Sequence, residues 1–159
     1  MVCYICCVKN ELSVQPGLEQ TGARQRLTAV REALLCLHKA LLDSERASYE
    51  QTFGKITSSY QFLQLLTNDP WFAWLQPVTQ LITAMDELLD AKEPLTAGGA
   101  AALVGRAKTL LVPTMDGEGF SRHYDEALQR DPDVVFAHAA ASSSVCPCTI
   151  TLASTLAGG

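Results

Sequence analysis

The chain has 159 residues, of which 48% are hydrophobic and 18% are charged. This length and composition suffice to bury a core without disulfides or metal, which excludes an intrinsically disordered protein and predicts a single folded domain. The formal net charge is -5, and no cluster of lysine or arginine occurs. An acidic chain without a basic patch argues against nucleic acid or an anionic membrane surface as the partner.

The sequence also lacks the marks of membrane and secreted proteins. It contains no run of about 18 apolar residues, the minimum for a transmembrane helix. The opening segment, MVCYICCVKN, has no basic region and no small-residue cleavage site of the kind that secretory signals carry. We therefore expect a cytoplasmic protein with reduced cysteines.

Changes in composition divide the chain into three parts. Residues 1–23 show no helical periodicity and contain one proline and two glycines near their end. From Ala139 onward the sequence reads AAASSSVCPCTITLASTLAGG, which is rich in small residues. We expect a flexible extension at residues 1–23, a helical bundle domain at residues 24–139, and a low-complexity, cysteine-containing tail at residues 140–159.

Two helices are predicted in the first half of the domain. Apolar residues spaced three and four apart indicate an amphipathic helix from about Arg24 to Tyr49 or Phe53. Its buried stripe is Leu27, Val30, Leu34, Leu37 and Leu41. Ser58 and Gln61 form a capping box, which starts a second helix that stops before Asp69. The buried face of this second helix is expected to be Phe62, Leu63, Leu65 and Leu66.

A third helix is predicted to begin at Asp69-Pro70. An aspartate can cap the first helical turn, and a proline at the first position loses no donor that is needed there. The aromatic residues of the segment PWFAWL therefore open this helix. Pro77 then removes a backbone donor, so the helix axis should kink or restart before an apolar stripe continues to Asp90.

The remaining helices follow from the same signals. Thr96 caps a fourth helix, Phe120 begins a fifth, and Asp131-Pro132 starts a short last turn that includes His138. The sequence thus predicts an all-α fold, a single compact bundle of about five helices with a short terminal helical turn. Its core is expected to include Leu34, Leu37, Leu41, Leu66, Trp74, Ile82, Met85, Leu110 and Leu128.

Four segments carry a resemblance to a known family: HKALLDSERASYEQTFGKI, DPWFAWLQPVTQLITAMDELLD, EPLT and GEGFSRHYDEALQRDPDVVFAHA. Together they resemble a family of small bacterial-type helical-bundle proteins, all of them uncharacterised hypothetical proteins, over about residues 24–139. The resemblance implies a helical bundle. It brings no activity, so no functional residue is carried over to this chain.

The cysteines near the two ends of the chain are the candidates for metal or redox chemistry. In principle they could assemble a thiolate site, whose ligands would be Cys3, Cys6, Cys7, Cys146 and Cys148. They lie on segments without a scaffold of their own, so reactive or incidental thiols are the favoured interpretation. Cys36 lies among the leucines of the first predicted helix and is expected to be shielded.

Other signs of catalysis or cofactor binding are weak. The familiar hydrolase, nucleotide-binding and zinc-protease motifs do not occur in the sequence. His123 and Glu126 lie three residues apart on one predicted helix, a spacing that metal sites in helical bundles use. No Glu-x-x-His repeat accompanies them, so a surface pair is favoured. We expect no cofactor and assign no catalytic residue.

Trp71, Phe72 and Trp74 pose the main functional question, because they could pack a core or form a surface for a partner. A rotation of about 100° per residue puts Trp71 and Trp74 on one face of a helix with Leu75, and Phe72 about a quarter-turn away. Core packing is the favoured interpretation, since large aromatic residues are mostly buried. The three aromatic residues are also our candidate partner surface.

Two functional hypotheses follow. The first is a non-catalytic structural or protein-interaction helical bundle, which forms a homo-oligomer or binds a helical protein partner. The alternative is a thiol-based metal-binding or redox protein that uses the terminal cysteines. The two differ in what they require, because only the alternative depends on residues near both ends of the chain.

Overall fold

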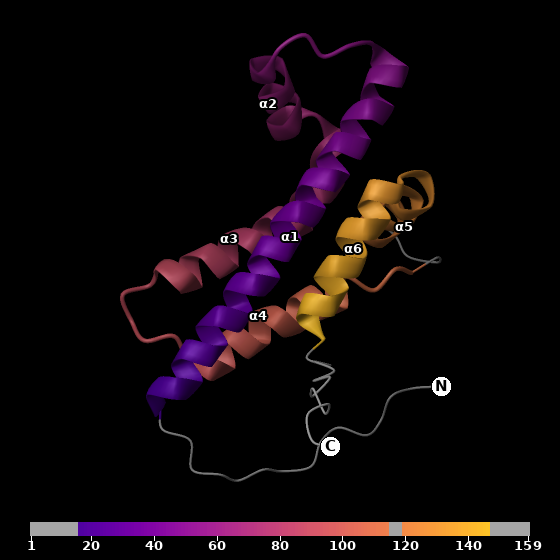
Figure 1. Ribbon diagram of the computed structural model, residues 1–159. Coiled ribbons are helices and arrows are strands. Elements are labelled where there is room, and N and C mark those ends of the chain that lie inside the picture. The colour runs from indigo at the N-terminus through magenta and orange to yellow at the C-terminus, as the bar shows by residue number, and fades with distance from the viewer. Residues whose placement is uncertain (1–15, 115–118, 147–159) are drawn as a thin grey trace, which may run out of the picture.

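The structure is a computed structural model that describes residues 16–114 and 119–146 (Figure 1). Its elements are α1 (Pro16–Phe53), α2 (Ser59–Asn68), the 3-10 helix η1 (Pro70–Leu75), α3 (Gln76–Asp90), α4 (Ala97–Leu110), α5 (Phe120–Arg130) and α6 (Pro132–Val145). Within the described residues every element is helical and the helices pack together, so the predicted all-α bundle is confirmed.

Helix α1 is the axis on which the other helices pack. It crosses the whole molecule in Figure 1, with α6 to its right and α3 to its left, and it contacts α3, α4 and α6. The predicted stripe of α1 is confirmed, and its fully buried members are Leu27, Val30, Leu34, Leu37 and Leu41. This continuous apolar stripe explains why one helix can hold three others.

The first helix begins at Pro16, although the sequence led us to expect a start near Arg24. The proline and glycine that suggested an irregular segment are compatible with a helix start, because proline is favoured at the first helical position. Gly22 lies inside α1, and a Cβ added there would meet no other atom. Its cost of about 1 kcal/mol relative to alanine is offset by packing of the neighbouring turn against the bundle.

The last helix, α6, continues to Val145, so the expectation of a short turn followed by a tail from residue 140 is wrong for residues 140–145. Val134, Ala141 and Val145 are buried at helical spacing along α6. Ser143 and Ser144 of the AAASSS run donate to the backbone carbonyls of Ala139 and Ala140, four residues earlier in the helix. Small residues let α6 lie close to α1, which composition alone did not reveal.

Four predicted N-caps are confirmed, and they are Ser58, Asp69, Thr96 and Asp131. Each side chain accepts a hydrogen bond from a backbone N–H in the first turn of the helix that follows. The capping box differs in one respect, because the Gln61 carboxamide accepts from the backbone N–H of Thr57 and not from that of Ser58. The predicted restart of the helix at Pro77 is also confirmed. The 3-10 helix η1 ends at Leu75, and α3 begins at Gln76 with Pro77 in its first turn.

Most of the expected core is confirmed. The buried members are Leu34, Leu37, Leu41, Trp74, Ile82 and Met85. Leu66, Leu110 and Leu128 are half-buried and pack on the edge of the core. Of the helices that the structure describes, none combines the length and the apolar character that crossing a membrane requires.

Replacing Leu37 by alanine should destabilise the fold by about 2 to 5 kcal/mol, because the side chain is fully buried and its truncation leaves a cavity. Urea unfolding followed by circular dichroism measures this cost. Leu35→Ala on the same helix is the control, because 38% of Leu35 is exposed, and it should cost less than about 1 kcal/mol. Equal costs would contradict the assignment of the buried face of α1.

Candidate functional site

The 3-10 helix η1 sorts its side chains into two groups that line different cavities. In a 3-10 helix, side chains three residues apart eclipse each other. Trp71 and Trp74 accordingly line one cavity, and Phe72 and Leu75 line another. The expectation that Trp71 and Trp74 share a face is therefore confirmed, whereas Leu75 lies with Phe72 because the helix has three residues per turn.

The cavity beside Phe72 and Leu75 is a groove of about 470 Å³ between α1, α2, η1 and α3. We call it the neutral groove, and its lining residues are His38, Leu42, Leu66, Thr67, Phe72, Leu75, Gln76, Thr79 and Gln80. No aspartate, glutamate, lysine or arginine is among them. A hydrogen bond of 3.1 Å joins His38 Nε2 to the Thr79 hydroxyl, and burial lowers the pKa of His38, which favours the neutral ring.

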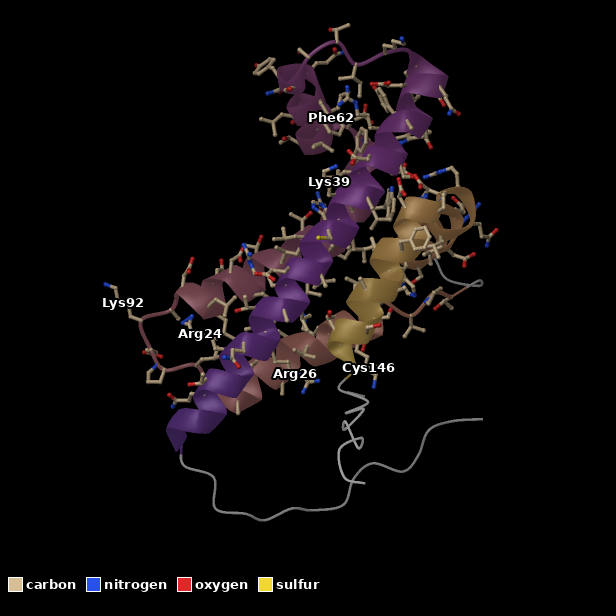
Figure 2. The ribbon with its side chains drawn as sticks, in the orientation of Figure 1. Arg24, Arg26, Lys39, Phe62, Lys92 and Cys146 are labelled. Carbon is tan, nitrogen blue, oxygen red and sulfur yellow. The ribbon has the colours of Figure 1, made fainter. Side chains whose placement is uncertain are left out.

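Helix α2, which forms one wall of the neutral groove, contains no buried residue. The expectation of a buried face on α2 is wrong, most clearly at Leu63, which is 58% exposed. Phe62 is half-buried and turns toward α1 (Figure 2), where the Arg46 guanidinium lies 5.1 Å from its ring centroid. Phe62 also meets Phe72 edge to face, with ring centroids 5.8 Å apart. These contacts hold α2 while leaving its other face open.

The surface around the neutral groove is unusually poor in charge. From Ile56 to Met85 the sequence contains a single charged residue, Asp69. The Asp69 carboxylate accepts from the Trp71 backbone N–H at 2.9 Å and from the Tyr49 hydroxyl at 3.4 Å. This segment supplies α2, η1 and most of α3, so three walls of the groove come from a nearly uncharged stretch of chain.

The cavity on the other side of η1 is polar. It measures about 370 Å³ and is lined from α1, η1 and α5 by Glu45, Ser48, Gln51, Thr52, Pro70, Trp71, Trp74, His123, Glu126 and Arg130. Arg130 donates to the Glu45 carboxylate at 2.5 Å and to the Ser44 hydroxyl at 3.1 Å. The Glu45 side chain is only 8% exposed, so Arg130 compensates a carboxylate that would otherwise be buried without a partner.

Trp71 and Trp74 serve mainly as packing groups. Trp74 stacks on His123 with ring centroids 5.4 Å apart, and Trp71 meets Tyr49 edge to face at 5.9 Å. The indole Nε1–H groups of both tryptophans are buried and have no hydrogen-bond acceptor among the described residues. An unpaired buried donor costs about 1 to 3 kcal/mol, and the aromatic contacts must offset that cost.

The core interpretation of the aromatic segment is confirmed for Phe72 and Trp74, which are 2% and 9% exposed. Trp71 is half-buried and packs on the core from its edge. The three aromatic residues that we proposed as a partner surface thus lie beneath the surface or at its edge. Phe72 contributes to the neutral groove as part of its floor, and the exposed residues beside that groove belong to α2.

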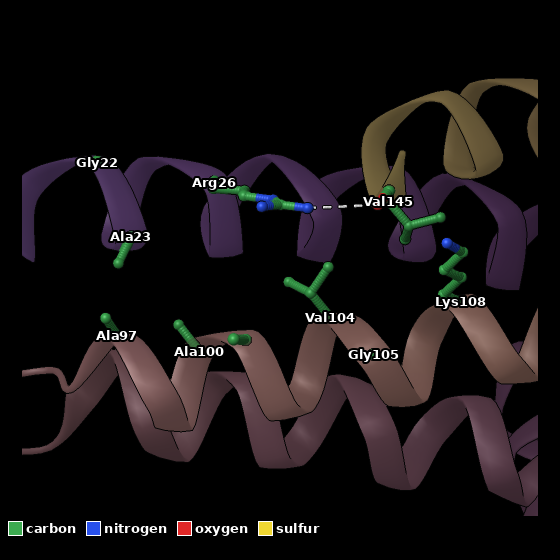
Figure 3. A pocket seen from close by; sticks show the side chains of 10 residues that line it. Gly22, Ala23, Arg26, Ala97, Ala100, Val104, Gly105, Lys108 and Val145 are labelled. Atoms are coloured by element: carbon green, nitrogen blue, oxygen red, sulfur yellow. Dashed lines mark hydrogen bonds between the residues drawn. The ribbon is translucent and has the colours of Figure 1, made fainter. Parts of the chain in front are cut away.

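A third cavity lies between α1, α4 and the end of α6, and small residues line most of it (Figure 3). It has a volume of about 450 Å³. Arg26 reaches across it to donate to the Val145 carbonyl oxygen at 3.4 Å, and Lys108 approaches the same residue from α4. The Arg26 bond satisfies a carbonyl at the C-terminus of α6, where a cation is favoured by the helix dipole. This cavity is a packing gap closed by a helix cap.

The structure describes two of the six cysteines, Cys36 and Cys146. Cys36 is exposed and free, so the expectation that it is shielded is wrong. It lies two residues, or about 200°, from Leu34 around α1 and therefore faces away from the buried stripe. Cys146 is also exposed and free. Cys3, Cys6, Cys7 and Cys148 lie outside the described residues.

No cluster of histidine, cysteine, aspartate or glutamate suited to a metal ion occurs within the described ranges, 16–114 and 119–146. The thiolate hypothesis needs residues beyond those ranges and stays a prediction. His123 Nδ1 lies 3.7 Å from a Glu126 carboxylate oxygen on the surface of α5. The distance and exposure of this pair fit the surface interpretation.

Comparison with other proteins adds no family or activity. The chain matches no protein-family model, no curated protein and no solved structure. The resemblance to helical-bundle hypothetical proteins therefore stays a prediction. Sequence reasoning missed the neutral groove, although the scarcity of charge between Ile56 and Met85 is visible in the sequence and could have indicated it.

The free energy of unfolding should fall as the pH drops from about 7.5 to about 5.5. Burial lowers the pKa of His38 and of His138 below the ordinary value of 6.5. The unfolded chain therefore binds protons in this range that the folded chain does not. The contribution of the two neutral histidines to the free energy of unfolding is fully present above pH 6.5. It is lost as the pH falls toward the lowered pKa values of the folded chain. Thermal melts should show a shallower pH slope for His138→Gln than for the original chain.

Both described thiols should react with Ellman's reagent in the native protein, because Cys36 and Cys146 are exposed and free. Mass spectrometry after brief labelling identifies the modified residues. Adding denaturant should not increase the rate at Cys36. Labelling of Cys36 only after denaturation would show that the register of α1 is wrong.

Proposed function

We propose that the chain is a non-catalytic protein-interaction module that binds an uncharged amphipathic helix in the neutral groove. The observation that carries the proposal is the combination of a groove without acidic or basic lining residues and an adjoining helix with no buried residue. Helix-in-groove recognition places a few apolar side chains of a short helix in such a groove. A charged helix would lose its hydration there without gaining a partner.

Several properties of the groove support binding over catalysis. Its volume of about 470 Å³ is in the range of sites that enclose a ligand or a few side chains. His38 is the only titratable side chain in its lining, and that ring is engaged by Thr79. The groove also offers no cation to a phosphate group, which supports a protein partner over nucleic acid or an anionic membrane.

We also infer that the protein works in the cytoplasm. The support is the state of its cysteines, because both described cysteines are free and exposed. Exposed free thiols are typical of a reducing compartment and are avoided in oxidising ones.

A short helix-stapled peptide of leucine, alanine and glutamine should bind the full chain, as measured by isothermal titration calorimetry. Burial of apolar surface should give a negative heat-capacity change of binding. Gln80→Glu introduces a charge into the groove and should weaken binding by about tenfold or more, because the peptide would cover an unpaired carboxylate. A matching peptide with serine in place of leucine should not bind.

Gln25→Glu is the matched control, because Gln25 is an exposed residue of α1 that does not line the groove. This variant has the same net charge as Gln80→Glu and should bind the peptide as the original chain does. Equal weakening by both variants, or equal binding of the leucine and serine peptides, would overturn the proposal.

A further inference from the structure

The chain itself contains a helix with the properties that the neutral groove requires. Helix α2 has no charged residue, and Tyr60 and Leu63 on it are 73% and 58% exposed. These two residues lie three apart and so form one ridge along the helix. We propose that the neutral groove of one copy binds α2 of a second copy, and that two copies pair about a two-fold axis. This inference rests on the proposed function and names the partner of the same groove.

The positions of the ridge and the groove suit such a reciprocal pair. Leu66 and Thr67 of α2 line the groove of their own copy. Leu63 lies one helical turn before them, so the ridge begins at the rim of the groove. In a two-fold interface, the same two surface elements of each copy meet the opposite elements of the other. An axis between ridge and groove lets each α2 enter the groove of the other copy.

Charge favours this face over the rest of the surface for self-association. Each copy carries a net charge of -5, so two copies repel each other through most orientations. The repulsion is smallest where the approaching faces are neutral. Lys39 and Asp43 follow the groove-lining residues His38 and Leu42 on α1, and they form an ion pair with each other at 2.5 Å. Asp69, the one charged residue of the segment that forms α2 and η1, is held by hydrogen bonds from Trp71 and Tyr49, so this face brings little charge to an approaching copy.

An exposed aromatic residue on another helix lacks the groove that accompanies the α2 ridge. Phe136 on α6 is 74% exposed, yet it lines none of the three cavities described above. Asp133 lies three residues before it, within the first turn of α6. A second copy would therefore meet a carboxylate and no groove at this point. Phe136 is the matched control position for α2.

Sedimentation equilibrium of the full chain tests the proposal. We expect a dimer that dissociates on dilution and that becomes tighter with added salt, because salt screens the net repulsion. Leu63→Glu should raise the dissociation constant at least about tenfold, whereas Phe136→Glu should leave it unchanged. Circular dichroism shows that both variants keep their helices. A chain that is monomeric at its highest soluble concentration, or a dimer that Leu63→Glu does not weaken, overturns the proposal.

Mixing two variants tests the reciprocal geometry. Leu63→Lys alters only the ridge, and Gln80→Glu alters only the groove. Each variant alone should dimerise poorly, because both of its interfaces are damaged. A mixture should form heterodimers in native mass spectrometry, since one interface is then original and the other pairs lysine with glutamate. Absence of heterodimers, with each variant alone impaired, would show that the ridge and groove do not contact each other.

The outcomes also separate this inference from the proposed function. If the original chain is monomeric but binds the leucine peptide in a manner sensitive to Gln80→Glu, the groove binds a different protein and the second-copy proposal fails alone. If the chain neither dimerises nor binds the peptide, both proposals fail. Dimers that resist Leu63→Glu while the peptide still binds would place self-association on another face.

Discussion

Burial of one stripe along α1 is the interaction on which the rest of the structure depends. Five apolar side chains at alternating spacings of three and four residues occupy the centre of the molecule, and α3, α4 and α6 all pack against α1. An isolated helix with this stripe would expose it to water. The free energy gained by covering it, about 1.5 to 3 kcal/mol for each large apolar side chain, drives the assembly of the bundle.

The second constraint is the geometry of η1. A regular α-helix over the aromatic segment would put Leu75 on the same face as Trp71 and Trp74, with Phe72 about a quarter-turn away. With three residues per turn, the segment instead turns Leu75 with Phe72 into the neutral groove and leaves the two tryptophans in the polar cavity between α1 and α5. Asp69 and Pro77 bracket this short helix, one as a cap and the other as a break. The cap and the break therefore confine the 3-10 geometry to this segment, and that geometry sets which of its side chains line the polar cavity and which line the neutral groove.

Much of this architecture could be predicted from the sequence, because caps and amphipathic spacing are local signals. Ser58, Asp69, Thr96 and Asp131 mark helix starts through bonds within a single turn. The extent of α6 was not predictable in this way, since Ala141 and Val145 are helical because they are covered by distant elements. The neutral groove joins residues from His38 to Gln80. Its walls are tertiary, so charge scarcity was its only sequence signal.

The pairing of α1 with α6 has a consequence for synthesis on the ribosome. Among the described helices these two form the most extensive contact, although they lie at opposite ends of the described chain. Residues 30 and 145 are both buried, and synthesis at about 5 to 20 residues per second separates their appearance by roughly 6 to 23 seconds. During that interval the stripe of α1 is covered only in part. The nascent chain thus presents an apolar helix that chaperones can recognise until its last helix emerges.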